Sequence, residues 1–119
     1  MPRPIRIRDV GFEPEATFFK PAGVPMASLE EVILTFEEVE ALRLKEVEGL
    51  GQTKAAKKMN VSQPTFFRIL STARKKIADA IVNGKAIRVQ GGNYKFIGTT
   101  YGPGQGRRGQ GRRFRGNIL

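Results

Sequence analysis

Apolar residues recur every three or four positions in three stretches of the chain, and this spacing predicts three amphipathic helices. The first predicted helix follows Thr35, which together with Glu38 has the residue types and spacing of a capping box. Its apolar face would consist of Phe36, Val39, Leu42, Leu44 and Val47. The acidic residues between them are expected on a solvated or protein-contacting side of the helix. Ser28 and Glu31 have the same spacing and predict a further helix start.

The second and third helices are predicted on either side of a short turn. One covers residues 52–59, and the other, the longest, covers residues 63–82. Asn60 is placed at the break because asparagine tolerates a left-handed backbone; Ser62 suits the N-cap, and Pro64 fits the first helical turn. The buried stripe of the long helix would consist of Phe66, Ile69, Leu70, Ala73, Ile77 and Ile81.

Turn and breaker residues divide the rest of the chain. Five prolines near the N-terminus predict an extended arm, in which the alternating residues 5–8 form a short strand. Residues 86–89 and 94–97 have the pattern of two strands, and Gly-Gly-Asn between them predicts a β-hairpin, or wing. The predicted fold is mainly α. Its expected parts are the arm (1–27), a helical domain with a C-terminal hairpin (28–97) and a disordered Gly/Arg-rich tail (98–119).

Charge is distributed unevenly along the chain. The 119 residues include 21 Lys and Arg against 11 Asp and Glu, which gives a net charge of +10. Residues 1–50 contain 10 of the acidic and 6 of the basic residues, whereas residues 51–119 contain one acidic and 15 basic residues. A basic segment of this kind is typical of proteins that neutralise nucleic-acid phosphates. A membrane-surface binder or a generically basic protein is the alternative.

The residue types that are missing exclude several classes of function. Without Cys or His the chain has no disulfide, no Cys/His zinc site and no histidine-dependent triad. No apolar run approaches the ~20 residues of a membrane span and no signal peptide is evident, so a cytoplasmic, nucleoid-associated protein is expected. Residues 104–109 match GxGxxG but lack the flanking strand and helix, so no cofactor is expected. An enzyme is not expected either, because no set of nucleophile, base and metal ligands is visible.

Residues 52–70 have the pattern of a helix-turn-helix, in which the second helix enters the DNA major groove and reads base edges near its N-terminus. Candidate base contacts are Gln63, Pro64, Phe67, Arg68 and Ser71. Candidate phosphate contacts are Ser62, Thr65, Lys54, Lys57, Lys58, Arg74, Lys75 and Lys76. The tail residues expected to bind nucleic acid nonspecifically are Arg107, Arg108, Arg112, Arg113 and Arg115.

Chemistry suggests a role for three of these side chains. Gln63 would pair with adenine, Phe67 would contact a thymine methyl group, and Arg68 would bind guanine or a phosphate. Each has an ordinary structural alternative: the two helices could be a plain helix pair, Phe67 could be core or a dimer contact, and Arg68 and the lysines could form a solvated face.

Four longer motifs make the sequence similar to a known family. They are FFKPAGVP at 18–25, LTFEEVEALRLKEVEGL at 34–50, AAKKMNVSQPTFFRIL at 55–70 and ARKKIADAIVNGKAIRVQGGNY at 73–94. Over about residues 1–95 the chain resembles uncharacterised protein family 0251 (domain of unknown function 134), whose members are small predicted prokaryotic DNA-binding proteins. Its middle portion also resembles region four of sigma factors. The resemblance implies a helix-turn-helix with a regulatory role, although Pro64 and Phe67 depart from the small or polar residues common at such positions.

These observations support three hypotheses on function. The first is a sequence-specific transcriptional regulator that binds double-stranded DNA, and a homodimer is expected because one short recognition helix reads few bases. The second is a nonspecific RNA- or DNA-binding protein driven by the basic half and the tail. The third is a protein-interaction adaptor of the transcription machinery that uses the acidic helix at 36–48.

Overall fold

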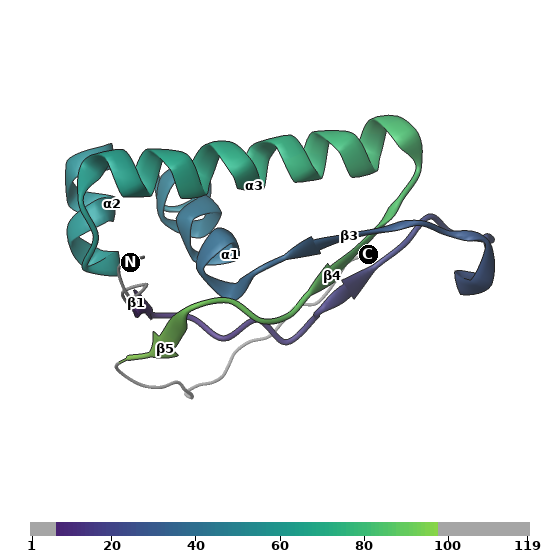
Figure 1. Ribbon diagram of the computed structural model, residues 1–119, viewed down its shortest axis with the longest axis horizontal. Helices are drawn as coiled ribbons and strands as arrows, with labels where there is room; N and C mark the ends of the chain where they lie inside the picture. Colours follow the sequence, from purple (N-terminus) through teal and green to yellow (C-terminus); the bar gives the residue numbers. More distant parts are fainter. Residues whose placement is uncertain (1–6, 98–119) are drawn as a thin grey trace, which may run out of the picture.

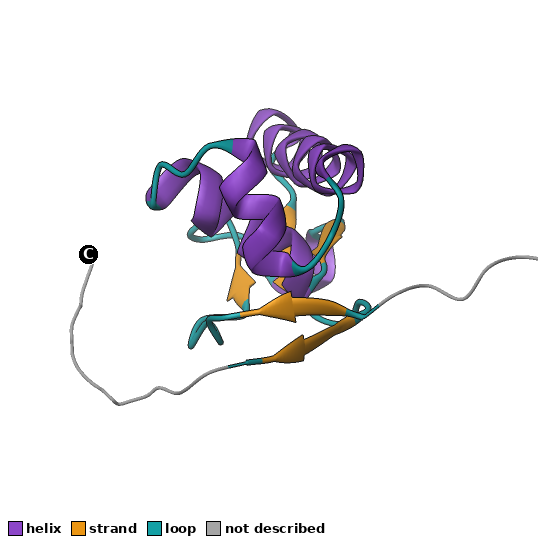
Figure 2. Ribbon diagram, turned by 90° about the vertical axis from the view of Figure 1, so that its left-hand side faces the viewer, coloured by secondary structure: helices purple, strands orange, loops and turns teal. Residues whose placement is uncertain are grey.

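The computed structural model of the chain describes residues 7–97, and this part is mainly helical, as the periodicity predicted (Figure 1). The long helix α3 (Gln63–Asn83) spans the molecule, with α2 (Gln52–Met59) at one end and α1 (Phe36–Leu42) beneath it. The strands are β1 (Arg8–Val10), β2 (Phe18–Phe19), β3 (Glu31–Leu34), β4 (Ala86–Val89) and β5 (Tyr94–Phe96). Figure 2 shows the helices gathered on one side of the strands.

The strands form two small sheets that join the two ends of the described chain. In the three-stranded sheet β4 is central, parallel to β3 and antiparallel to β2, with Leu34 opposite Val89 and Phe18 opposite Arg88. The second sheet consists of β1 and β5, which run parallel. Both strands of the N-terminal arm therefore pair with strands that follow α3. The strand predicted at residues 5–8 begins at Arg8 in the structure, and residues 1–6 lie outside the described range.

The predicted hairpin, and with it the wing, is wrong because β4 and β5 lie in different sheets. Both edges of β4 are occupied, one by β2 and the other by β3. Gly91 and Gly92, with φ of 75° and 112°, carry the chain past the start of α1. There the Phe36 amide donates to the Gly91 carbonyl (3.1 Å), and the Asn93 amide donates to the Glu37 carboxylate (3.1 Å). A local turn signal does not reveal which strand edges are free.

The helix start predicted at Ser28 is also wrong. Residues Met26–Ser28 form a single 3₁₀ turn (η1), and Glu31–Leu34 follow as β3 in parallel register with β4. The β-branched Val32 and Ile33 favour this pairing. Here the long-range partner strand outweighs a two-residue match to a capping motif.

The capping box at Thr35 is confirmed, but the predicted faces of its helix are not. The Thr35 hydroxyl accepts from the Glu38 amide (3.2 Å), and the Glu38 carboxylate accepts from the Thr35 amide (2.9 Å). The helix continues beyond α1 as a π-helical segment (η2, Arg43–Val47), where Val47 is 78% exposed. The acidic residues of α1 are buried instead, because α1 lies in the centre of the molecule and contacts α2, α3 and β1.

Two apolar clusters pack along the inner face of α3. One joins α1, η2, α2 and the first half of α3, and its buried members are Ala41, Leu44, Ala55, Ala56, Met59, Phe66 and Leu70. The other lies between α3 and the three-stranded sheet and is formed by Leu34, Ala73 and Val89. The predicted stripe fails only at its end, where Ile81 is 74% exposed and Ala80 is buried. A period of 3.6 residues counted from Phe66 returns at position 80 rather than 81.

Candidate nucleic-acid interface

The turn between α2 and α3 has the geometry that its sequence predicted. Asn60 ends α2 in the left-handed conformation (φ 60°, ψ 45°). The Val61 amide donates back to the Ala56 carbonyl (3.0 Å), so the last turn of α2 is closed. Ser62 then caps α3 by accepting the Thr65 amide (3.3 Å), and Pro64 occupies the first turn, where it needs no amide partner. Local residue chemistry therefore fixes the direction in which α3 leaves α2.

The first turns of α3 have one buried and one exposed side. Phe66 and Leu70 are fully buried in the cluster with α1 and α2. All five candidate base contacts are spaced so that they share the opposite face, because residues four apart lie above one another on a helix. Four of them, Gln63, Pro64, Phe67 and Arg68, are exposed, and Ser71 is partly buried. Phe67 is 50% exposed, so it is not a core residue.

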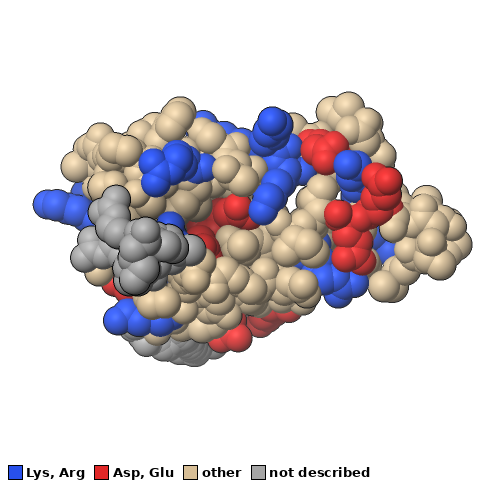
Figure 3. All heavy atoms as spheres, in the orientation of Figure 1, with Lys and Arg blue, Asp and Glu red and all other residues tan. Residues whose placement is uncertain are grey.

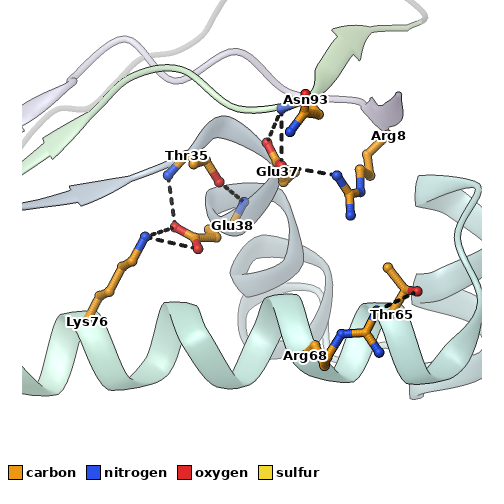
Figure 4. A network of polar contacts seen from close by, with 8 residues as sticks. All are labelled: Arg8, Thr35, Glu37, Glu38, Thr65, Arg68, Lys76 and Asn93. Atoms are coloured by element: carbon orange, nitrogen blue, oxygen red, sulfur yellow. Dashed lines mark hydrogen bonds and ion pairs between the residues drawn. The ribbon is translucent and has the colours of Figure 1, made fainter. Parts of the chain in front are cut away.

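Hydroxyl groups bond to the two long polar side chains of this face. The Thr65 hydroxyl accepts from the Ser62 hydroxyl (3.0 Å) and from Nη2 of Arg68 (3.3 Å). Figure 4 shows Arg68 lying along α3 beside Thr65. The Gln63 amide nitrogen donates to the Thr53 hydroxyl on α2. With its amide donor engaged, Gln63 cannot form the two-bond pair with adenine expected from the sequence unless it first leaves Thr53.

Arg68 differs from every other arginine in the described range in having no carboxylate partner. Four arginines within residues 7–97 face acidic groups: Arg8 faces Glu37, Arg43 faces Glu40, Arg74 faces Glu46 and Arg88 faces Glu31. Arg68 is bonded only to the neutral Thr65 hydroxyl. Its charge is therefore uncompensated and exposed at the start of α3, where an anionic or acceptor-rich ligand could approach.

The candidate phosphate contacts divide into two groups. Those that are exposed near the turn, and so lie beside the candidate base contacts, are Ser62 and the three α2 lysines, Lys54, Lys57 and Lys58. Thr65 is partly buried, and Lys75 is exposed further along α3. Figure 3 shows Lys and Arg side chains over the part of the molecule that contains α2 and the first half of α3.

Two predicted phosphate contacts are engaged elsewhere. The Lys76 ammonium donates to Glu38 Oε1 (2.8 Å) and to the Ile33 carbonyl (2.7 Å), so it points into the molecule toward α1 (Figure 4). The expectation that Lys76 contacts phosphate is therefore corrected. Arg74 is exposed but its Nε donates to Glu46 (2.7 Å), so this arginine would have to leave Glu46 to contact a phosphate.

Three buried carboxylates on α1 are the polar residues that sequence reasoning missed. Glu37 accepts the Asn93 amide and Glu40 accepts the Gly11 amide (2.9 Å), which fixes the segments on either side of the β1–β5 sheet. Glu38 binds Lys76 and thereby joins α1 to α3. Only Glu38 had a local signal, its place in the capping box. The partners of the other two are backbone amides distant in sequence, which no spacing reveals.

Ion pairs also shift several pKa values away from the α2–α3 face. The Glu40 carboxylate raises the pKa of Arg43, although burial opposes the shift. At the C-terminal end of α3, hydrogen bonds from Lys85 and Asn83 lower the pKa of Asp79, and the same Asp79 raises the pKa of Lys85. These groups stay charged at neutral pH and hold their elements together.

Two searches for other kinds of site gave negative results over the described range. Residues 7–97 contain no cluster of acidic side chains arranged to hold a metal ion. None of the helices between these limits is both long and apolar enough to cross a membrane. The tail residues proposed to contact nucleic acid, Arg107, Arg108, Arg112, Arg113 and Arg115, lie outside the described range.

Comparison with known proteins gives close relatives of this chain. The family described as "Protein of unknown function DUF134" matches residues 1–97. A UPF0251 protein of Caldanaerobacter subterraneus subsp. tengcongensis is 64% identical over 98 residues, which cover 82% of this chain and 83% of that protein. Another from Thermoanaerobacter pseudethanolicus is 64% identical over 95 residues, 80% of each chain. One from Moorella thermoacetica is 60% identical over 98 residues, 82% of this chain and 66% of its own. No solved structure matches the chain significantly.

Proposed function

The chain belongs to the DUF134 family, whose description names no activity, and we propose from its own residues that it is a sequence-specific DNA-binding protein. In this proposal α2, the turn and α3 form a helix-turn-helix similar to region four of sigma factors. The first turns of α3 enter the major groove, and the protein acts as a transcriptional regulator.

The observation that carries the proposal is the exposed face at the start of α3. It combines an arginine without a carboxylate partner, an exposed aromatic ring and a capped helix N-terminus on an otherwise buried helix. A helix packed only for stability has no need to leave Arg68 uncompensated and Phe67 exposed side by side. Both features suit the edges of bases, which present hydrogen-bond acceptors and thymine methyl groups in the major groove.

Each side chain has a definite role in this arrangement. Arg68 would donate a pair of hydrogen bonds to guanine, and Phe67 would pack against a thymine methyl group. Ser62 and the N-terminus of α3 would face a phosphate, toward which the helix dipole and the free amides point. Lys54, Lys57 and Lys58 on α2 would contact the phosphate backbone beside the groove.

The buried carboxylates of α1 argue against the adaptor hypothesis. A partner that recognises an acidic helix needs accessible carboxylates, but Glu37, Glu38 and Glu40 are each at most 7% exposed and have partners within the chain. Nonspecific binding of RNA or DNA stays the second candidate, because it requires only the basic charge.

Selection from a random duplex library tests the proposal, with affinities then measured by fluorescence anisotropy over a salt series. We expect one compact motif, and two inverted copies of it if the protein binds as a homodimer. Arg68→Ala should weaken binding to that motif by ~1–3 kcal/mol and relax the preference at one base pair. Arg68→Lys keeps the charge but loses the paired donors, so it should lose the base preference while retaining most of the nonspecific affinity.

Lys95→Ala is the matched control for charge. Lys95 is exposed on β5, on the far side of α1 from α3, and its removal also takes away one positive charge. It should leave the selected motif unchanged. Recovery of no motif, together with equal binding of duplex and RNA, would show that charge alone is the function. Equal losses for Arg68→Ala and Lys95→Ala on every duplex would exclude base reading by Arg68.

A further inference from the structure

Thr65 is placed between two other side chains on the exposed face of α3. Its hydroxyl oxygen accepts from the Ser62 hydroxyl at 3.0 Å and from Nη2 of Arg68 at 3.3 Å. The Ser62 oxygen in turn accepts the Thr65 amide at 3.3 Å. Arg68 is thereby linked, through one threonine, to the group that caps the helix. Since the cap has a fixed place at the start of α3, the chain of hydroxyls gives the guanidinium a fixed place as well.

We propose that Thr65 is a positioning residue, which holds the Arg68 guanidinium in the orientation that reads a guanine; this inference rests on the proposed DNA-binding function. Side chains of a helix lean toward its N-terminus, so Arg68 reaches back along α3 over the residue three positions before it. The Thr65 hydroxyl lies at that point. The contact therefore directs the end of a long, flexible side chain toward the part of a recognition helix that reaches the bases.

A neutral partner suits this task better than a charged one. The other arginines within residues 7–97 are paired with carboxylates, which fix their direction but also neutralise their charge. The Thr65 hydroxyl uses one of the five N–H donors of arginine and leaves its positive charge and its other donors for a ligand. Guanine offers two neighbouring acceptors, N7 and O6, to a pair of such donors. Fixing the guanidinium in advance reduces the rotamer entropy that binding would cost.

The test compares four proteins on the duplex that wild-type protein selects, on the same duplex with the guanine replaced, and on a random duplex. The proteins are wild type, Thr65→Val, Arg68→Ala and the double variant. Valine keeps the shape and branching of threonine and the backbone amide that bonds to Ser62, and it removes only the hydroxyl. Thermal unfolding of each variant checks that α3 is intact. Thr65→Val should lower the preference for guanine about five-fold, the typical value of one net hydrogen bond, and leave random-duplex affinity unchanged.

Two further measurements separate positioning from a structural role. Thr65→Ser restores a hydroxyl and should restore the preference for guanine. In the Arg68→Ala background, Thr65→Val should have no additional effect. In the free protein, ¹⁵N relaxation of the Arg68 Nε–H should show greater side-chain mobility in Thr65→Val, whereas Arg88, bonded to Glu31, serves as an internal reference.

The outcomes distinguish this inference from the proposed function. If a motif is selected and lost on Arg68→Ala, but Thr65→Val changes neither the preference for guanine nor the mobility of Arg68, positioning by Thr65 is overturned and DNA binding stands. A loss that persists in the Arg68→Ala background also overturns it. If wild-type protein selects no motif, the proposed function fails and the inference fails with it.

Discussion

Gly92 shows how a single residue fixes the path between the two sheets. Its φ of 112° is unfavourable for other residues, and a Cβ there would collide with Oε1 of Glu37 and lie 2.8 Å from Cβ of Thr35. Gly91 also has a positive φ, 75°, but a Cβ there would meet no atom within 4 Å. The neighbouring glycines therefore separate backbone strain from steric collision.

We predict that Gly92→Ala destabilises the protein substantially more than Gly91→Ala. Gly91→Ala should cost about 1–2 kcal/mol, the cost of an alanine in the left-handed region. Gly92→Ala should exceed about 3 kcal/mol, because the collision adds overpacking at the start of α1 to the backbone strain. Urea unfolding of both variants measures the difference. Equal losses would mean that Glu37 moves aside easily and does not hold the turn in place.

At this scale the sequence revealed those roles that depend on neighbours in the chain. Asn60, Ser62 and the pair Thr35–Glu38 all function within a few residues, and each was predicted from type and spacing. Glu37 and Glu40 were expected in solvent, but their partners, Asn93 and Gly11, lie 56 and 29 residues away in sequence. Burial of a carboxylate by a distant backbone amide leaves no local pattern.

The α2–turn–α3 unit is the element on which the proposed function depends. Its bounds agree with the prediction to within one residue, because helical periodicity and caps are local properties. Strand pairing is not local, and here the expectation of a hairpin was wrong. The sequence identified β4 and β5 but could not show that β2 and β3 occupy the edges of β4. The family resemblance is confirmed by residues 1–97, and it concerns the chain rather than its activity.

We predict that the backbone conformation of Asn60 determines whether this unit forms. Asn60→Gly should change the free energy of unfolding by only a few tenths of a kcal/mol, because glycine adopts the left-handed conformation at no steric cost. Asn60→Val should cost about 2 kcal/mol, since a β-branched residue is strained at φ 60°. Thermal unfolding monitored by circular dichroism measures both. Similar stability of the valine and glycine variants would show that the turn relaxes to another conformation.

In the whole molecule α3 connects the two apolar clusters, so the exposed face at its start is held by the entire described fold. Its first half packs with α1 and α2, its middle packs on the three-stranded sheet, and Lys76 binds Glu38 between them. A recognition helix supported in this way is rigid before it meets DNA, which lowers the entropic cost of binding. Sequence specificity is therefore expected to come from this folded part.

Affinity, in contrast, should draw on charge outside the described fold. Residues 98–119 contain five arginines and no acidic residue. We predict that replacing Arg107, Arg108, Arg112, Arg113 and Arg115 with glutamine in the full chain weakens binding to selected and random duplexes by the same factor. The slope of log affinity against log salt should become shallower by up to about 4, because each phosphate contact contributes ~0.9. Replacing Lys54, Lys57 and Lys58 of α2 is the companion experiment and should remove up to about 3 from the slope. An unchanged slope for the tail variant would mean that these arginines do not contact the duplex, and the folded part alone would then account for both affinity and specificity.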